Sequence, residues 1–311
     1  MGGRCNAALS YSQRKIEMTT KNDLLTATLD DKITKSKQLI FEWYHQFNGQ
    51  VYVSFSGGKD STVLLHLVRS MFPEVPAVFS NTGLEYPDIV EFVKQTENVT
   101  MIRPKMTFKQ VLEQKGYPVV SKEQALYIRQ YRNAKSEKQK RLRWFGTEKG
   151  NFKIAEKWKF LVDAPFKVSD ECCEIMKKRP FHQYEKETGR TPFIGVMASE
   201  SNLRRRLFLR TECNAFHAKH PQSRPMIFWT DEDVWAYIKR FNLPYCKLYD
   251  MGMKRTGCMF CMFGAHIDDS RFKALKEIYP KLYDYCMNKL ELEKVLAYVK
   301  QGGQPDLFGG N

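Results

Sequence analysis

Residues 51–61 of the chain read VYVSFSGGKDS, and this stretch decides the fold. Its first five residues form a short, mostly apolar run that is typical of a buried strand, and apolar residues at helical spacing follow from Ser61. Gly57 and Gly58 separate the two. A glycine-rich turn between a strand and a helix directs backbone N–H groups, and the positive end of the helix, at a bound anion. The stretch therefore predicts a phosphate-binding loop in an α/β fold.

The flanking sequence repeats this alternation of strand and helix. Short apolar runs predict strands at 77–79 and 99–102, and apolar residues at helical spacing predict helices at 31–48 and 87–95. Strands that alternate with helices pair in parallel through right-handed crossovers. We therefore expect the fold class to be α/β, a doubly wound, mostly parallel sheet with helices on both faces.

One segment interrupts the alternation. From about residue 121 to 160 the chain is strongly basic and helical in pattern, and we expect it to form an inserted basic helical subdomain. Strand character returns at 192–197, and a further helix is predicted at 231–241. The α/β nucleotide-binding domain is accordingly expected to span 31–265, with the insertion inside it.

Both ends of the chain are expected to lie outside that domain. Residues 1–30 are predicted to be an N-terminal extension, with Met18 as an alternative start, and their first part lacks the apolar core of a secretory signal. Residues 266–311 are predicted to form a C-terminal helical region that ends in a flexible, glycine-rich tail from Gln301.

Composition narrows the class of protein. The chain has 311 residues, of which 42% are hydrophobic and 13% aromatic, so it can bury a sizeable core and wholesale disorder is excluded. No apolar run approaches the roughly 18 to 20 residues that a membrane-spanning helix needs, so no membrane is expected among its partners. The expected location is cytoplasmic.

The net charge points to an anionic partner. The formal charge of +15 favours nucleic acid, nucleotides or anionic lipid. Just over half of this surplus lies in residues 129–159, where eleven basic residues and three acidic ones give a net charge of +8. Aromatic residues are interleaved with these charges: Tyr131, Trp144, Phe145 and Trp158. Such a mixture suits phosphate binding and base stacking, and a solvated helical hairpin with inward-facing aromatics is the alternative.

The eight cysteines are better explained by metal or redox use than by disulfides, given the expected location. Four of them pair along the sequence as Cys172-Cys173 and Cys258-x-x-Cys261. Four thiolates can close a tetrahedral zinc site or hold an iron–sulfur cluster. Structural zinc usually takes two C-x-x-C pairs, whereas adjacent cysteines point apart and suit the more widely spaced irons of a cubane. A cluster, a zinc ion and unligated thiols all remain open. The other four cysteines stand alone in the sequence: Cys5, Cys213, Cys246 and Cys286.

The phosphate loop also carries a family resemblance. The string SGGKDS at 56–61 resembles the signature of the PP-loop ATP pyrophosphatases, which split ATP between its α and β phosphates, and its spacing is too short for a Walker-type loop. The string NTGLEYP at 81–87 looks like the nucleotide-side motif of that family, at the carboxyl ends of the strands. The resemblance implies an adenine nucleotide alpha hydrolase-like fold. It also implies ATP contacts from the following residues: Ser54, Ser56, Gly57, Gly58, Lys59, Asp60, Ser61, Asn81, Thr82, Gly83 and Glu85.

Further motifs resemble the phosphoadenosine phosphosulfate (PAPS) reductase branch of the family, and the resemblance covers roughly residues 35–265 apart from the basic insertion. These motifs are Gly195–Ser201 with Arg204–Arg206, Trp229–Trp235, and the run from Pro244 to Cys258. The cysteine pairs are similar to the 4Fe-4S site of the cluster-bearing adenylylsulfate (APS) reductases. The resemblance thus implies a 4Fe-4S cluster on Cys172, Cys173, Cys258 and Cys261. Basic neighbours would offset the thiolate charge: Lys177, Lys178, Arg179, Lys254 and Arg255.

Two features set the chain apart from the sulfonucleotide reductases. Those enzymes use a nucleophilic cysteine near the C-terminus, whereas residues 301–311 contain none and Cys286 is the one candidate after Cys261. Their phosphate loop is commonly degenerate, whereas this one is complete. With the basic insertion, the combination is similar to PP-loop enzymes that insert sulfur into nucleic acids, namely the cluster-dependent tRNA thiolases and the PP-loop subunit of DNA phosphorothioation systems.

The leading hypothesis is an ATP-dependent, AMP-forming sulfurtransferase. ATP with Mg²⁺ would bind at the loop, an acceptor oxygen would attack the α phosphorus, and sulfur delivered through the cluster would displace AMP. The catalytic residues on this hypothesis are Lys59, Asp60, Glu200 and Arg255. Asp60 would be the metal partner, and Glu85 or Glu200 would position metal or substrate.

The expected partners follow from the hypothesis. They are ATP, a nucleic acid (tRNA or DNA) bound through residues 129–159, and a sulfur donor such as a cysteine desulfurase. Two alternatives remain open. One is an APS/PAPS reductase that acts on a small sulfonucleotide, and the other is a non-catalytic iron–sulfur regulator that senses nucleotides.

Overall fold

The computed structural model describes residues 21–302, so the first part of the predicted N-terminal extension (1–20) and the end of the predicted tail (303–311) lie outside the described residues. The chain divides into two compact units. Unit 1 comprises the chain up to Ser80, Pro87–Ile102 and Gln183–Gly252, and unit 2 comprises Asn81–Tyr86, Arg103–His182 and the chain from Met253.

Unit 1 contains a six-stranded sheet with the order β3-β2-β1-β4-β6-β5. Every neighbouring pair is parallel except β5 and β6, which are antiparallel. This confirms the predicted doubly wound, mostly parallel α/β sheet. The strands are β1 (Val51–Ser54), β2 (Ala77–Ser80), β3 (Val99–Ile102), β4 (Thr191–Ile194), β5 (Asn214–Ala215) and β6 (Gln222–Ser223).

The strand order reverses at β1. Val53 of β1 pairs with Ala77 of β2 on one side and with Phe193 of β4 on the other. Ligands of open α/β sheets bind at the carboxyl ends of the strands where the order reverses. Because residues 55–61 leave the sheet at the carboxyl end of β1, the topology places the predicted phosphate loop at such a point.

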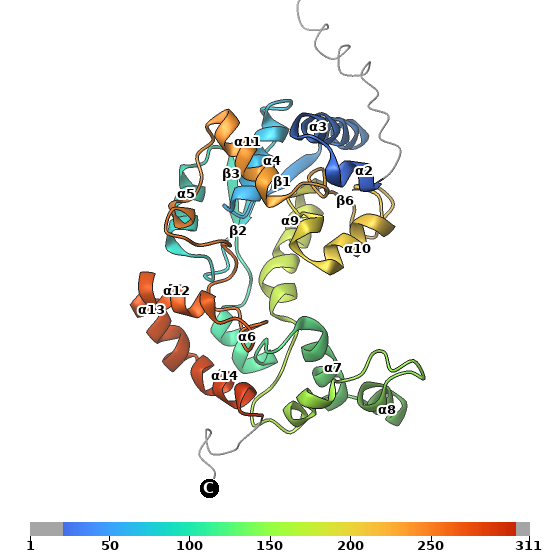
Figure 1. The fold of residues 1–311 in the computed structure, drawn as a ribbon, viewed down its shortest axis with the longest axis vertical. Coiled ribbons are helices and arrows are strands. Elements are labelled where there is room, and N and C mark those ends of the chain that lie inside the picture. The colour runs from blue at the N-terminus through green and yellow to red at the C-terminus, as the bar shows by residue number, and fades with distance from the viewer. Residues whose placement is uncertain (1–20, 303–311) are drawn as a thin grey trace, which may run out of the picture. The chain divides into compact units, whose positions relative to one another are not determined.

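Helices α3, α4 and α11 of unit 1 pack together beside the sheet (Figure 1). The Thr28 side chain accepts the Asp31 N–H and fixes the start of α3, and positive φ angles at Asn48 and Gly49 follow its end. The helices that include unit 1 residues are α2 (Lys21–Thr26), α3 (Leu29–Gln46), α4 (Lys59–Arg69), α5 (Pro87–Gln95), α9 (Arg179–Thr188, with unit 1 starting at Gln183), α10 (Asn202–Arg210) and α11 (Asp231–Phe241).

The core of unit 1 joins α3 to the sheet and to the segment before α11. Trp43 and Trp229 are both fully buried there. Trp229 Nε1 donates to Ser36 Oγ (2.9 Å), and that hydroxyl donates to the Pro225 carbonyl (2.7 Å). Burial holds Trp229 in the core, and these buried hydrogen bonds also fix the position of its ring.

Unit 2 is helical, and it contains the segment predicted as a basic helical insertion. In that segment α7 packs against α8, and Arg132 of α7 donates to the carbonyls of Val162, Ala164 and Phe166. The helices of the segment, which confirm its predicted helical character, are α7 (Lys122–Arg132), α8 (Glu137–Phe145) and the 3₁₀ helix η1 (Glu156–Val162).

The predicted C-terminal helical region is confirmed as a series of short helices (Figure 1). Pro280 is the first residue of a new helix. Glu291, whose φ is +56°, separates the last two helical elements of the region. The elements are α12 (Ser270–Ile278), α13 (Pro280–Asp284), the π-helical turn η5 (Tyr285–Lys289) and α14 (Leu292–Lys300), and unit 2 also contains α6 (Phe108–Lys115) and the π-helical turn η2 (Glu174–Lys178). Across residues 21–302, no helix is both long and apolar enough to span a bilayer.

Candidate functional site

The phosphate loop, residues 54–61, connects β1 to α4 in unit 1. Gly57 has a φ of +71°, and a Cβ atom there would lie 2.9 Å from methyl carbons of Ile89 and Val93 on α5. Both the backbone angle and the lack of space require glycine. Gly58 is the N-cap of α4 and has no side chain, so the N-cap residue itself accepts none of the first N–H groups of that helix.

Hydroxyl groups close the loop on itself. The Ser56 N–H donates to Ser61 Oγ (3.1 Å), and the Gly58 N–H donates to Ser56 Oγ (3.3 Å). The Lys59 N–H donates to the Tyr249 hydroxyl (3.0 Å). A phenol oxygen thus uses one of the donors that an anion at this helix start would need, and Tyr249 was not among the predicted site residues.

Lys59 is buried and lies between two carboxylates. Its Nζ is 2.9 Å from Asp60 Oδ1 and also forms an ion pair with Asp231, while the Trp235 ring lies 5.9 Å away. Burial opposes the positive charge most strongly, but the hydrogen bonds and charges of Asp231 and Asp60 raise the pKa of Lys59 above its ordinary value. The lysine is therefore a permanent cation. Asp60, predicted as a metal partner, pairs with this cation in the structure.

The end of β4 approaches the same loop. A Cβ atom on Gly195 would lie 3.4 Å from the Asp60 carbonyl oxygen, so the two backbones are in contact. The Glu200 carboxylate accepts the Met197 N–H (2.9 Å) and pairs with Arg204. Glu200 is a predicted catalytic residue, and these two contacts join it to its own turn and to the start of α10.

The predicted nucleotide-side motif lies in unit 2 and forms a tight turn. The Glu85 carboxylate accepts the Thr82 N–H (2.9 Å) and the Thr82 hydroxyl (2.8 Å), and Asn81 Oδ1 accepts the Gly83 N–H (3.2 Å). Glu85 is buried, and its Oε1 lies 3.7 Å from Lys177 Nζ. Its nearest cation thus belongs to the cysteine-bearing part of unit 2.

The four paired cysteines come together in unit 2. Burial raises the pKa of Cys172 far above its ordinary value, and the charges of Cys173, Cys258 and Cys261 raise it further. All four thiols are thus within electrostatic range of one another, and we call them the four-cysteine site. No three of these sulfur atoms lie within 4.8 Å of each other among the described residues, whereas a zinc ion with bonds of about 2.3 Å would hold them about 3.8 Å apart.

Lys177 is the cation of the four-cysteine site. Burial opposes its charge, but Cys258 and Glu85 raise its pKa, and it forms a hydrogen bond with Cys258. Burial likewise raises the pKa of Cys258, and Lys177 counters this shift. Of the basic neighbours that the sequence suggested, Lys178 pairs instead with Glu174 (3.2 Å), and Arg255 is exposed just before Cys258.

Backbone contacts hold the Cys-x-x-Cys turn in place. The Met259 N–H donates to the Leu84 carbonyl (2.8 Å), and Arg271 Nη1 donates to the Cys261 carbonyl (2.8 Å). The turn is thereby fixed to the 81–86 segment on one side and to α12 on the other.

The donor set fits a metal centre. Cys172 is buried and the other three cysteines are half-buried. Four thiolates in such a site need more positive charge than the ammonium of Lys177 supplies, and bound metal cations provide it. Glu85 and Lys177 would lie beside that centre, next to its ligand Cys258.

The basic segment divides into structural and exposed residues. Arg129 pairs with Asp170 (2.7 Å), and Trp144 is covered by Tyr131 (ring centroids 5.1 Å apart) and by Lys159 (4.4 Å from its ring). These contacts fit the alternative of inward-packed aromatics.

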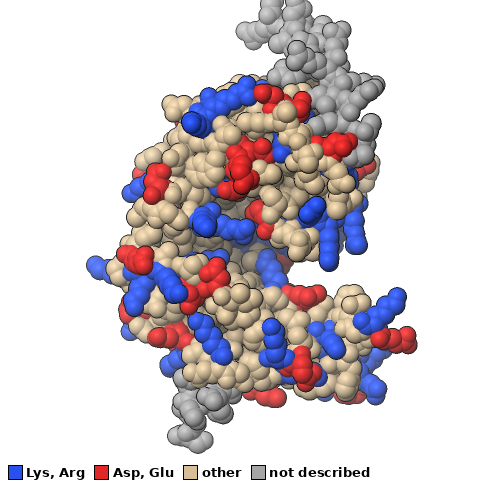
Figure 2. Space-filling view, in the orientation of Figure 1, with Lys and Arg blue, Asp and Glu red and all other residues tan. Residues whose placement is uncertain are grey.

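Other residues of the segment face outward. Phe145 and Phe152 are 64% and 56% exposed. Lys and Arg side chains are spread over the α7–α8 surface, with acidic residues between them (Figure 2). The exposed cations of residues 129–159 are Lys135, Lys138, Arg141, Lys149, Lys153 and Lys157. We call four of them, Lys138, Arg141, Lys149 and Lys153, together with the two phenylalanines the α8 patch.

Comparison with known proteins identifies several relatives. The family described as phosphoadenosine phosphosulfate reductase domain matches residues 50–263. Two proteins of Methanocaldococcus jannaschii that are named as uncharacterized are 25% and 26% identical over 88% and 79% of the chain, which spans only 59% and 42% of their lengths. An adenosine 5'-phosphosulfate reductase of Geobacillus kaustophilus is 27% identical over 74% of this chain and 81% of its own.

Solved structures show weaker likeness. A phosphoadenylyl-sulfate reductase from Candida auris in complex with phosphate is 16% identical and covers 74% of this chain and 93% of its own, with a TM-score of 0.43. A U34-tRNA thiolase from Methanococcus maripaludis with its 4Fe-4S cluster is 15% identical and covers 90% of this chain and 84% of its own, with a TM-score of 0.38.

Proposed function

Because the chain belongs to the phosphoadenosine phosphosulfate reductase domain family of PP-loop proteins, we propose that it activates an acceptor with ATP for iron–sulfur-dependent sulfur transfer, and that the acceptor is a nucleic acid. The observation that carries this proposal is the four-cysteine site, with the Lys177 ammonium in electrostatic contact with Cys258 and 3.7 Å from Glu85. It supports a metal centre in a chain whose phosphate loop is complete.

The phosphate loop supplies the ATP-binding step. The N–H groups at the start of α4 and the cation of Lys59 face the β and γ phosphates, with Mg²⁺ offsetting the remaining charge. An acceptor oxygen forms a bond to the α phosphorus, and the bond from that phosphorus to the bridging oxygen breaks. Pyrophosphate leaves with the electron pair, and an adenylated acceptor remains. Asp231 and Asp60 keep Lys59 charged and oriented throughout. That Asn81–Glu85 contacts the same nucleotide remains a prediction.

The four-cysteine site supplies the sulfur side. When bound, a 4Fe-4S cluster would supply the iron–sulfur chemistry by which sulfide-level sulfur replaces AMP on the adenylated acceptor, with AMP as the leaving group. Cys172, Cys173, Cys258 and Cys261 would hold it, and Lys177 would offset their charge beside Glu85.

An adenylylsulfate reductase is the second candidate, since several relatives bear that name. Such a reaction needs a nucleophilic thiolate outside the metal ligands. Cys286, the one candidate after Cys261, is fully buried, and burial raises its pKa far above the ordinary value. A buried thiol of this kind is a poor nucleophile, which favours the first proposal.

The α8 patch supports a nucleic acid as the acceptor. It combines exposed cations with two exposed phenylalanine rings, Phe145 and Phe152, and such surfaces hold phosphates and stack bases. A small sulfonucleotide would not need this surface.

The test uses protein purified without oxygen. We expect sulfur from labelled sulfide to enter bulk tRNA or DNA when ATP is present, with one AMP formed for each sulfur transferred. A parallel reaction contains adenylylsulfate and a thiol reductant. Release of sulfite there, without sulfur in the nucleic acid, would replace the proposal with the reductase.

A matched pair of variants isolates the four-cysteine site. Cys258→Ala is expected to lose iron and sulfur incorporation, whereas Cys213→Ala in unit 1 keeps both. Equal iron content and activity in the two variants would remove the four-cysteine site from the proposal.

A further inference from the structure

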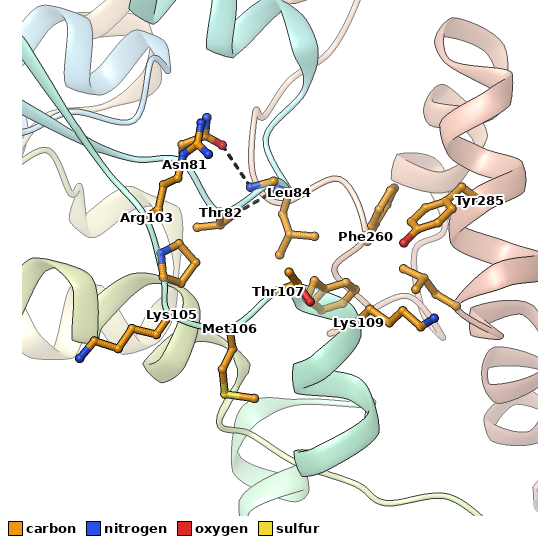
Figure 3. A pocket seen from close by; sticks show the side chains of 14 residues that line it. Asn81, Thr82, Leu84, Arg103, Lys105, Met106, Thr107, Lys109, Phe260 and Tyr285 are labelled. Atoms are coloured by element: carbon orange, nitrogen blue, oxygen red, sulfur yellow. Dashed lines mark hydrogen bonds between the residues drawn. The ribbon is translucent and has the colours of Figure 1, made fainter.

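Unit 2 contains a cavity of about 630 Å³, and its lining includes part of the segment that was predicted to contact ATP (Figure 3). Its walls are formed by Asn81–Leu84, the segment Arg103–Lys109, and three residues further along the chain, Phe260, Tyr285 and Leu290. Its volume lies within the range of about 300 to 1,000 Å³ that is usual for small-molecule sites.

One wall of the cavity is cationic. Its three charged lining residues, Arg103, Lys105 and Lys109, are all basic and all exposed. Arg103 lies beside Asn81, and Lys105 and Lys109 extend to opposite sides of their segment (Figure 3). Lys109 has Glu113 at 3.8 Å, but that pair is exposed and therefore weak. The wall thus favours an anion.

Three aromatic residues also line the cavity, and we call them the aromatic wall. The rings of Phe260 and Tyr285 have centroids 6.3 Å apart, and Phe108 continues the row at 6.2 Å from Phe260. Phe260 is buried, whereas Tyr285 is 43% exposed and leaves a ring face for a planar ligand. Every kind of nucleobase can stack on such rings, because each has a flat aromatic face.

The aromatic wall includes one residue of the Cys-x-x-Cys turn. Phe260 lies between Cys258 and Cys261 in the chain, and the neighbouring Met259 is hydrogen-bonded to Leu84, which also lines the cavity. A ligand in the cavity would therefore lie next to the Cys-x-x-Cys turn.

We propose that the cavity receives one nucleotide of the acceptor nucleic acid. Its base lies against Tyr285 and Phe260, and its phosphates lie on Arg103, Lys105 and Lys109. A nucleotide carries both the planar ring and the negative charge that the two walls require. This inference rests on the proposed function, because it gives the base or phosphate that accepts sulfur a place beside the sulfur donor.

The test measures binding and does not depend on turnover. The probes are bulk tRNA and a short single-stranded DNA, each titrated against the full-length protein purified without oxygen, and ATP is titrated in parallel. For Tyr285→Ala we expect the affinity for one of the two nucleic acids to fall by roughly 5- to 100-fold, the range for removing one stacking partner of a base. The control Phe241→Ala removes a similarly exposed ring in unit 1 and should change nothing.

A second set of variants keeps the test decisive if Tyr285→Ala folds poorly. Arg103→Gln, Lys105→Gln and Lys109→Gln alter exposed side chains. Each of them that binds a phosphate should, when replaced, reduce the salt slope of log K by roughly 0.7 to 0.9. The control is Lys94→Gln.

Three results would overturn the assignment of the cavity. If both sets of variants bind nucleic acid as the unaltered protein does and still transfer sulfur, the cavity does not bind the acceptor, although the proposed function stands. An equal loss of ATP affinity would assign the cavity to ATP. No binding of tRNA or DNA by the unaltered protein would remove both proposals.

Discussion

The charge and position of the Lys59 ammonium depend on partners that are far away in the sequence. Asp231, which holds its ammonium, lies 172 residues along the chain. Because two carboxylates stabilise the charge against burial, the lysine stays protonated at any physiological pH. The role we propose for it is to present a fixed cation at the start of α4.

Replacing Lys59 tests that role. We expect Lys59→Met to lower the rate of AMP formation from ATP by roughly 10²- to 10³-fold, the usual effect of removing one group that stabilises developing negative charge. Lys94→Met, at an exposed position on α5, is the control, and thermal melting checks that both variants fold. A rate close to that of the unaltered protein would show that Lys59 does not act on the phosphates.

His66 gives unit 1 a pH-dependent stability. Burial, with a smaller contribution from Lys37, lowers the pKa of His66, whose Nδ1 lies 2.9 Å from the Tyr237 hydroxyl. The unfolded chain therefore takes up a proton at a higher pH than the folded one, and stability falls as pH drops below about 6.5. His66→Gln should lose less free energy of unfolding than the unaltered protein between pH 7.5 and 5.5.

Urea denaturation at the two pH values measures this difference. His45→Gln, at an exposed position on α3, is the matched control and should keep the original pH dependence. If His66→Gln behaves like His45→Gln, the buried imidazole does not contribute.

At the scale of elements, two buried tryptophans, Trp43 on α3 and Trp229 before α11, differ in one hydrogen bond. Trp229 Nε1 donates to Ser36, whereas Trp43 Nε1 has no hydrogen-bond partner in the described part of the chain. Trp229→Phe should therefore cost about 1 kcal/mol more free energy of unfolding than Trp43→Phe, because only the former breaks a buried hydrogen bond. Chemical denaturation measures both, and equal costs would contradict the assignment.

The sequence predicts the elements best where local signals agree. The bounds of α5, β3 and α11 match their predictions, and α11 has a capping box between Thr230 and Asp233. The predicted strand at 192–197 ends at Ile194, because the chain turns toward the 3₁₀ turn that begins at Ala198.

Other elements lack such signals. α10 was not predicted, because its apolar residues do not share a buried face: Leu203, Leu207 and Leu209 are exposed. β5 and β6 have two residues each, too few to show an alternating pattern. Tertiary contacts, rather than local sequence, form these elements.

Site residues follow a similar rule. The phosphate loop could be recognised because its residues are adjacent, and Lys177 could be suggested because it is near Cys172 in the chain. The contacts of Lys59 with Asp231 and Tyr249, and of Lys177 with Glu85, join residues far apart in the sequence. No spacing rule predicts such contacts, so they required the structure.

At the scale of the whole molecule, the surplus positive charge divides by location. Arg129 and Arg132 have structural partners, whereas the cations of the α8 patch are exposed. Neutralising Lys138, Arg141 and Lys149 together should weaken nucleic-acid binding. It should also reduce the salt slope of log K by about 0.7 to 0.9 for every phosphate that these side chains bind.

The matched control neutralises three exposed lysines of unit 1, Lys94, Lys186 and Lys239. It removes the same charge from the molecule as the α8 variant. If the two triple variants weaken binding equally, the effect comes from net charge and the patch has no role.

The cleavage products of ATP test the central claim most directly. Protein purified without oxygen is incubated with sulfide, nucleic acid and ATP labelled at its α phosphate. We predict labelled AMP and pyrophosphate in amounts that match the sulfur incorporated. With Lys59→Met, both products should form only at the residual rate of that variant. Labelled ADP, or sulfite formed from adenylylsulfate while ATP remains intact, would contradict the account.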